Sequence, residues 1–127
     1  MAYTTELMSF AVKVGKEERA NEWMRILVQR QAECVATLDR ELMHFESIFR
    51  SEIGERIYLS WYSVQGKTGE QVKSSPFPID KVHMAFWQEC IDPSIPPIQY
   101  QHIVNFLPLS VAETIGARDI QLTQNAP

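Results

Sequence analysis

Hydrophobic and polar residues alternate with a period of two over residues 7–14, as they do in a half-buried β-strand. The same alternation recurs over residues 43–52 and 56–64, and a short turn at Gly54 joins these two segments as a hairpin. Residues 98–107 form the last predicted strand. The pattern thus predicts four strands, each with one side facing a core.

Between the strands, apolar residues recur at spacings of three and four, which is typical of amphipathic helices. The first such segment predicts one long helix over residues 17–40, since no glycine or proline interrupts it. The second predicts a helix over residues 78–91 that begins at Pro78, where a missing N–H costs nothing. A short helix is expected from Leu109 to Gly116, with Ser110 and Glu113 as its capping box.

The resulting order, β-α-β-β-α-β, is the ferredoxin-like arrangement of an α+β protein. It predicts an antiparallel sheet with two helices on one face and the other face open. The length of 127 residues fits a single domain over residues 1–127. Within it, we expect a core over residues 5–108, followed by a short helix and a tail over residues 109–127.

The alternation also assigns side chains to the two faces of the sheet. The face under the helices is expected to carry Met8, Phe10, Val12, Phe45, Phe49, Leu59 and Trp61. The open face is expected to carry Leu7, Ser9, Ala11, His44, Glu46, Ile48, Arg50, Tyr58, Ser60, Tyr62, Gln101, Ile103, Asn105 and Leu107. Such a mixed apolar and polar patch marks an interaction site, so we predict a homodimer through this face.

Composition and charge exclude several classes of partner. The net charge is −4 and no stretch is dense in lysine or arginine, so we expect no nucleic-acid partner. The apolar runs are shorter than the roughly 20 residues that span a bilayer, so we expect no membrane contact. A signal peptide is not recognisable at the N-terminus. These features favour a cytoplasmic protein in which Cys34 and Cys90 are two buried free thiols.

Candidate chemistry gathers on the predicted hairpin. His44 and Glu46 lie two residues apart on one strand, and Tyr58 and Tyr62 are predicted to share the same face of the paired strand. This set could form an acid–base cluster in a cavity between two sheets of a dimer. The alternative is a polar dimer interface, with ion pairs such as that of Glu46 with Arg50.

Two further residues complete the ligand-binding candidates. His83 interrupts the apolar stripe of the second helix, where it either points into a pocket or bonds a carboxylate such as Asp80 or Glu89. Asn105 joins the open face from the last strand. The histidines lack the close spacing of a metal motif, so neither a metal nor a cofactor is predicted.

Several stretches of the chain resemble the dimeric α+β barrel superfamily and, more narrowly, a family of small, mostly bacterial domains of unknown function. The matching stretches are Gly15–Arg19 with Trp23–Met24, Glu46–Arg50, Tyr58–Tyr62, and Pro78–His83 with Phe86. The resemblance covers about residues 5–108 and implies the fold but no established activity. The wider superfamily includes cofactor-independent monooxygenases, haem-degrading enzymes and dimeric stress-induced proteins, so fold alone does not give function.

The sequence therefore leaves two functions open. One is a small homodimeric protein that binds a small molecule in a cavity between the sheets, or uses its open face for dimerisation alone. The other is a cofactor-independent monooxygenase-like enzyme, or a related one, that acts on a small aromatic substrate. No catalytic residue set of those relatives is recognisable in this chain.

Overall fold

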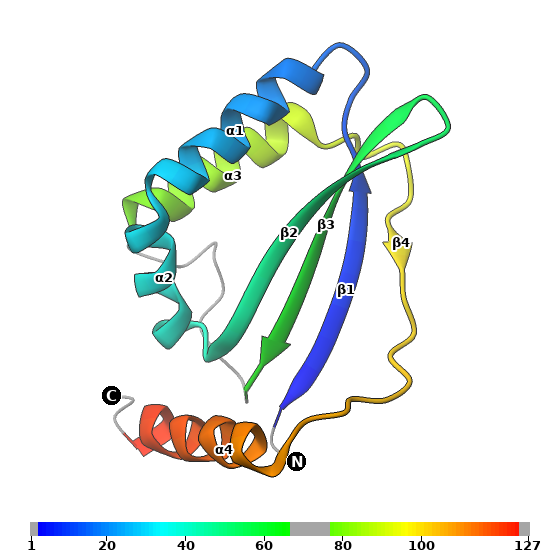
Figure 1. The fold of residues 1–127 in the computed structure, drawn as a ribbon. Coiled ribbons are helices and arrows are strands. Elements are labelled where there is room, and N and C mark those ends of the chain that lie inside the picture. Colours follow the sequence, from blue (N-terminus) through cyan, green and yellow to red (C-terminus); the bar gives the residue numbers. More distant parts are fainter. Residues whose placement is uncertain (1–2, 67–76, 125–127) are drawn as a thin grey trace.

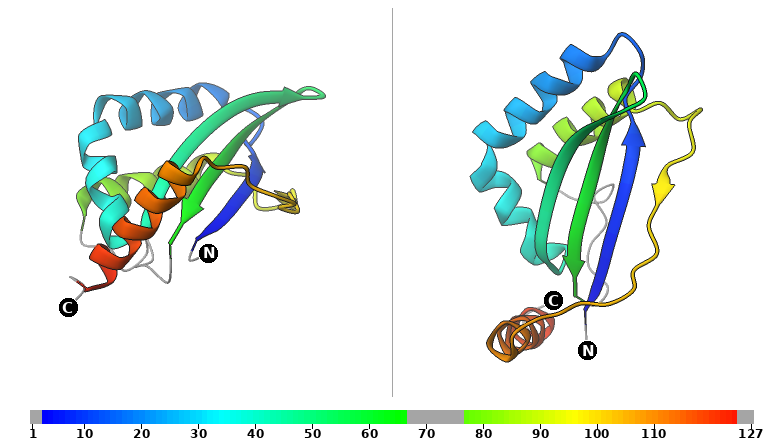
Figure 2. Two further views of the ribbon diagram at one scale, coloured as in Figure 1. Left: turned by 60° about the horizontal axis from the view of Figure 1, so that its bottom comes forward. Right: turned by 45° about the vertical axis from the view of Figure 1, so that its right-hand side comes forward.

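The structure is a computed structural model, and it describes residues 3–66 and 77–124. Its elements in chain order are β1 (Thr4–Ala11), α1 (Glu17–Gln29), α2 (Gln31–Arg40), β2 (Met43–Ile53), β3 (Arg56–Gln65), α3 (Pro78–Cys90), β4 (Ile98–Gln99) and α4 (Leu109–Gln124). The strands form one antiparallel sheet in the order β2-β3-β1-β4. Helices α1, α2 and α3 lie on one side of this sheet, and α4 lies across the end of its strands (Figures 1 and 2). The α+β class and the ferredoxin-like order of strands are as predicted.

The two central strands carry the side chains that pack under the helices. Met8 pairs with Trp61 and Phe10 with Leu59, so these four residues share one face of the sheet. That face belongs to the core, because Leu59 is buried in it and Phe10 and Trp61 pack against it. The predicted inward residues of the first and third strands are therefore correct. Gly54 makes the hairpin turn with a positive φ of 63°.

The core centres on Trp23, which projects from α1 and is fully buried. Its ring stacks on Phe86 of α3, with ring centroids 6.2 Å apart. Cys90 is also fully buried, whereas Cys34 is only half-buried, so the expectation of two buried free thiols is correct for Cys90 alone. Aromatic rings thus hold α1 and α3 together over the middle of the sheet.

The predicted helix over residues 17–40 is wrong in one respect, since it is divided in two at Arg30. This residue leaves the helical conformation, with φ −105° and ψ 32°, while its N–H closes the last turn of α1 on Ile26. Its guanidinium holds both carboxylate oxygens of Glu33 in the first turn of α2, at 2.6 Å. The break changes the direction of the chain (Figure 1), although no glycine or proline marks it in the sequence.

The predicted faces of the second strand are reversed. Ile48 lies opposite Trp61 and Arg50 opposite Leu59, and both partners face the helices. Because residues directly opposite each other share a face, Ile48, Arg50 and, by alternation, Glu46 also lie on the helix side. The expectation that these three residues lie on the open face is wrong.

Phe45 and Phe49 therefore point to the open side, where they are 50% and 57% exposed. Phe45 contacts the ring of Tyr62 at 5.9 Å between centroids. A β-bulge between Met43 and Phe45 puts His44 out of the regular alternation. Phe45, Phe49, Tyr58 and Tyr62 are referred to below as the open sheet face.

The C-terminal part also differs from the prediction. The last strand includes only Ile98–Gln99, so the rest of the expected strand over 98–107 is absent from the sheet. Helix α4 continues through Gly116 instead of stopping there, and Ser110 is its second residue rather than its cap. Within the described residues, no helix has the length and apolar character that crossing a membrane would need.

Candidate functional site

A pocket of about 910 Å³ lies between helices α1, α2 and α3 and strands β2 and β3. Its size is within the range of small-molecule sites in proteins. Its wall includes apolar side chains from each layer, namely Met24, Leu27, Leu38, Ile48, Leu59 and Ile79. Polar side chains also line this wall, among them Glu46 from β2, and Asp80 and His83 from α3. This cavity is called the helix-side pocket below.

Asp80 is the third residue of α3, which starts at Pro78, and it is only 7% exposed. Its Oδ2 atom meets no hydrogen-bond donor from any described part of the chain. A buried carboxylate oxygen without a donor is unfavourable by roughly 1–3 kcal/mol or more, and native proteins rarely keep one without a use. Asp80 therefore places a buried acceptor without a described donor in the wall of the pocket.

Glu46 has an unusual acidity. Burial, as the largest cause, and the nearby carboxylates of Glu41 and Asp80 together raise the pKa of its carboxyl from 4.5 to about 7. The side chain is open to the pocket, but protein around the pocket replaces much of the bulk water. Within residues 3–66 and 77–124, Glu46 forms neither an ion pair nor a hydrogen bond. A carboxyl of this pKa can both accept and donate a proton near neutral pH.

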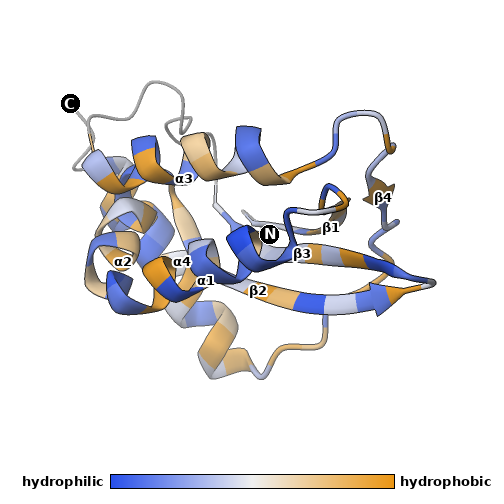
Figure 3. Cartoon of the chain, turned by 90° about the horizontal axis from the view of Figure 1, so that it is seen from above, coloured by the Kyte–Doolittle hydropathy of each residue, from blue (hydrophilic) through white to orange (hydrophobic). Residues whose placement is uncertain are grey.

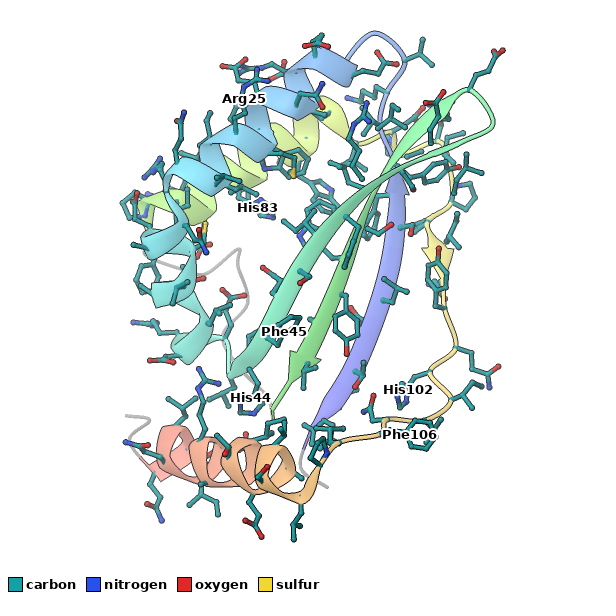
Figure 4. The ribbon with its side chains drawn as sticks, in the orientation of Figure 1. Arg25, His44, Phe45, His83, His102 and Phe106 are labelled. Atoms are coloured by element: carbon teal, nitrogen blue, oxygen red, sulfur yellow. The ribbon has the colours of Figure 1, made fainter. Side chains whose placement is uncertain are left out.

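His83 is held in one tautomer. The indole N–H of Trp23 donates to its Nδ1 at 3.1 Å, so the neutral ring carries its proton on Nε2. Burial lowers the pKa of His83, and the nearby Asp80 opposes that shift in part. The ring reaches from α3 toward the sheet (Figure 4) and lines the pocket. It can therefore act there as a neutral hydrogen-bond donor.

Together these side chains provide one buried acceptor, one proton-exchanging carboxyl and one neutral donor. Cys34 also lines the pocket, but burial raises the pKa of its thiol, so it is not activated as a nucleophile. Among the described residues, no three histidine, cysteine or acidic side chains are grouped as they would be around a metal ion.

The structure separates the predicted cluster of His44, Glu46, Tyr58 and Tyr62. Glu46 lies on the helix side, whereas Tyr58 and Tyr62 lie on the open sheet face, because they alternate with the buried Leu59. The expectation that these four side chains share one face is therefore wrong. The expected ion pair of Glu46 with Arg50 is also absent from the described part of the chain.

His44 lies at the end of the sheet beside α4 and has a buried side chain (Figure 4). Arg118 donates to its Nδ1 at 2.6 Å, and Asp119 Oδ1 is 3.7 Å from its Nε2. Burial and the charge of Arg118 lower the pKa of His44, against a smaller raising effect of Asp119. Asn105 donates to Thr5 Oγ1 at 2.7 Å. Neither residue lines the helix-side pocket.

Of the six predicted ligand-binding candidates, only Glu46 and His83 line this pocket. Asp80 was predicted only as a partner of His83, although it proves to be the buried acceptor of the site. An acidic residue two positions after Pro78 looks like an ordinary first-turn acid of a helix. Its burial depends on the fold, so no local signal identifies it.

The protein belongs to the α+β class and has a ferredoxin-like fold. This follows from its element order and its open sheet, and the helix-side pocket lies between the two layers. The chain belongs to a family of unknown function (DUF6176), whose sequence model matches residues 3–110. This membership confirms the predicted resemblance to a family without an assigned activity, while a bacterial origin stays a prediction.

Among solved structures, the crystal structure of an L-rhamnose mutarotase from Formosa agariphila is similar, with a TM-score of 0.47 and 14% sequence identity. The likeness covers 82% of this chain and 99% of the mutarotase chain. No curated protein has a sequence that matches this chain.

Proposed function

We propose that the protein binds a small organic molecule in the helix-side pocket and exchanges a proton with it through Glu46. The observation that carries this proposal is the pair of carboxylates, Glu46 and Asp80, which line a pocket of about 910 Å³ without a donor from the described residues. The site thus lies under the helices and not in a cavity between two sheets.

Each polar group has a distinct part in this function. Glu46, with a pKa of about 7, can act as a general base in one half of a reaction and as a general acid in the other. Asp80 keeps a buried acceptor without a described donor in the wall of the pocket. His83, with its Nδ1 occupied by Trp23, donates through Nε2 and stays uncharged.

The test is a fragment screen by amide NMR on the isotope-labelled protein, run in parallel on Glu46→Gln and on the control Glu52→Gln. Glu52 lies on the same strand as Glu46 but does not line the pocket. We expect hits whose shift changes cluster on β2 and α3, and which weaken in Glu46→Gln but not in the control. Hits that all lie on the open sheet face would contradict the proposal.

We also propose that the open sheet face forms a homodimer. Support comes from its exposed aromatic residues and from the apolar segment that leads from β4 into α4 (Figure 3), where Ile103 and Phe106 are exposed. A patch of this kind is rare on a monomer surface. A mass near 14.7 kDa by light scattering at high micromolar concentration would contradict the dimer.

A cytoplasmic location remains part of the proposal and is supported by the two free thiols.

A further inference from the structure

His83 presents an N–H group that a ligand in the helix-side pocket can reach. Trp23 occupies Nδ1 of the ring at 3.1 Å, so the neutral imidazole carries its proton on Nε2. In the described part of the chain this Nε2 atom has no acceptor, and protein does not enclose it completely. The ring lines the pocket and extends from α3 toward the sheet (Figure 4). The core therefore fixes a hydrogen-bond donor that is left for a ligand.

Glu46 lies near His83 and reaches the same pocket from the opposite layer. It comes from β2, whereas His83 comes from α3, and both side chains line the pocket. The carboxylate of Asp80 acts electrostatically on both of them, so the three groups lie in one part of the pocket. The side chain of Glu46 is exposed and makes no hydrogen bond with any described residue. A proton-exchanging carboxyl and a neutral donor therefore face the pocket together.

This pair of groups suits a ligand with a carbonyl group. The donor needs an oxygen acceptor, and the carboxyl needs a proton that becomes acidic when that oxygen is bound. The carbon next to a carbonyl carries such a proton, because its removal leaves the negative charge on the carbonyl oxygen as an enolate. A neutral imidazole that polarises the carbonyl, together with a glutamate base, can perform this chemistry.

The rest of the wall favours an apolar body for the ligand. Its side chains include Met24, Leu27, Leu38 and Ile79. Apolar surroundings also strengthen the hydrogen bond from His83 to a developing enolate oxygen, because few water molecules compete with it. The polar and the apolar parts of the pocket thus fit one ligand that has a carbonyl group on a hydrocarbon body.

We propose that the ligand is a carbonyl compound with an apolar body, whose oxygen accepts a hydrogen bond from His83 Nε2 and whose α-proton is exchanged with Glu46. This inference rests on the proposed function of the same pocket and adds the ligand class and the reaction class. In the first step the C–H bond breaks, its proton forms an O–H bond on Glu46, and the electron pair moves to the carbonyl oxygen. Return of the proton to the same carbon, or to another carbon of a conjugated enolate, restores ionised Glu46. The reaction is therefore an isomerisation that needs no co-reactant.

Two probes with the same phenyl body test the binding step: acetophenone, which has a carbonyl group, and ethylbenzene, which has none. Both are titrated by NMR on the isotope-labelled protein, with amide shifts and the imidazole nitrogen shifts of His83 as readouts. We expect acetophenone to bind about fivefold more tightly, as one hydrogen bond allows, and to shift the Nε2 signal. His83→Phe should reduce its affinity to that of ethylbenzene. His102→Phe, outside the pocket (Figure 4), should bind as the wild type does.

The proton exchange is measured in D2O as the loss of the methyl proton signal of acetophenone. We expect the wild type to catalyse this exchange, Glu46→Gln to be slower by about a hundredfold or more, and Glu52→Gln, outside the pocket, to match the wild type. The wild-type rate should rise as pH rises through about 7, because only the ionised carboxyl takes the proton. If His83→Phe does not fold, this pH profile and its loss in Glu46→Gln decide the question.

Pocket binding of ethylbenzene as tightly as acetophenone would overturn the carbonyl inference and leave small-molecule binding intact. Binding of acetophenone without exchange above the rate in buffer would do the same. Absence of pocket shifts with both probes would overturn both proposals. The failure of the inference and the failure of the binding function are therefore distinguishable with the same two probes.

Discussion

Trp23 donates its indole N–H to Nδ1 of His83 across 3.1 Å, and this bond joins α1 to α3 at the wall of the helix-side pocket. The two rings also pack together, with centroids 5.2 Å apart. Since Trp23 is fully buried, the core itself fixes the tautomer of a histidine that faces the pocket. Core packing and site chemistry thus share one residue.

Trp23→Phe should raise the pKa of His83, because it keeps an aromatic ring in the core but frees Nδ1 to accept a proton. The lost hydrogen bond and the smaller ring should lower the free energy of unfolding by about 1–3 kcal/mol. The pKa is measured by NMR titration of the imidazole protons, and stability by urea unfolding. Trp61→Phe is the control, as its ring lies 6.0 Å from His83 without a hydrogen bond to it in the described structure. An unchanged His83 pKa in Trp23→Phe would show that the bond is not formed in solution.

Glu46→Gln should change how stability depends on pH. The pKa of Glu46 is about 7 in the folded protein against 4.5 ordinarily, so the folded state holds this proton more tightly than the unfolded chain. The stabilisation of the folded state by this proton is complete below about pH 4.5 and is lost as pH rises through 7. Between pH 5 and pH 8, the wild type should therefore lose about 1 kcal/mol relative to Glu46→Gln, after allowance for solvent in the pocket.

The measurement is urea unfolding of both proteins at several pH values in that interval. Glu52→Gln, on the same strand but outside the pocket, should follow the wild type throughout. Parallel curves for wild type and Glu46→Gln would mean that Glu46 has an ordinary pKa.

Leu59→Ala should lower the free energy of unfolding by about 2–5 kcal/mol, because Leu59 is 1% exposed and its loss leaves a cavity under the helices. Arg25→Ala, at an exposed position of α1 (Figure 4), should cost less than about 1 kcal/mol. Both values come from denaturant titrations at one pH. Equal losses for the two variants would contradict the assignment of Leu59 to the core.

Much of the fold could be predicted because period-two and helical spacing follow burial closely on β1, β3 and α3. The second strand was misassigned because its aromatic residues, Phe45 and Phe49, were expected to be inside. β2 is an edge strand, and its helix side faces the pocket, where Glu46 and Arg50 are accommodated. Apolar alternation shows that a strand has two kinds of face, but it does not show which one a helix covers.

The candidate site was predictable only in part for a related reason. Glu46 and His83 stand out as polar residues in regular elements, whereas the importance of Asp80 depends on its burial in the folded protein. The break at Arg30 helps to shape the pocket, yet it comes from local backbone conformation and a contact with Glu33. Long-range packing, which no local pattern encodes, decides the burial of Asp80, whereas the break is a local feature that helical spacing alone does not mark.

Phe49→Asp should shift the proposed dimer toward monomer. Phe49 is 57% exposed on the open sheet face, so an aspartate there would place an unpaired charge in the interface without entering the core. Sedimentation velocity over a concentration series measures the shift, which we expect to be at least about tenfold in the dissociation constant. Ala85→Asp adds the same charge at an exposed position of α3 and should leave association unchanged. Equal association of Phe49→Asp and wild type would exclude this face as the interface.

Arg118→Gln should raise the pKa of His44 and loosen the attachment of α4. Arg118 donates to Met43 O at 2.9 Å, to His44 Nδ1 at 2.6 Å and to Asp39 Oδ1 at 2.5 Å, so one side chain joins α4 to both β2 and α2. Burial is the largest cause of the lowered His44 pKa and would remain, but the repulsion from the arginine charge would be removed. Loss of these bonds should cost about 1–3 kcal/mol of unfolding free energy. NMR titration of His44 measures the first effect and urea unfolding measures the second. Arg25→Gln, on the distant α1, is the control. A His44 pKa that falls in Arg118→Gln would show that Arg118 does not lie against this ring.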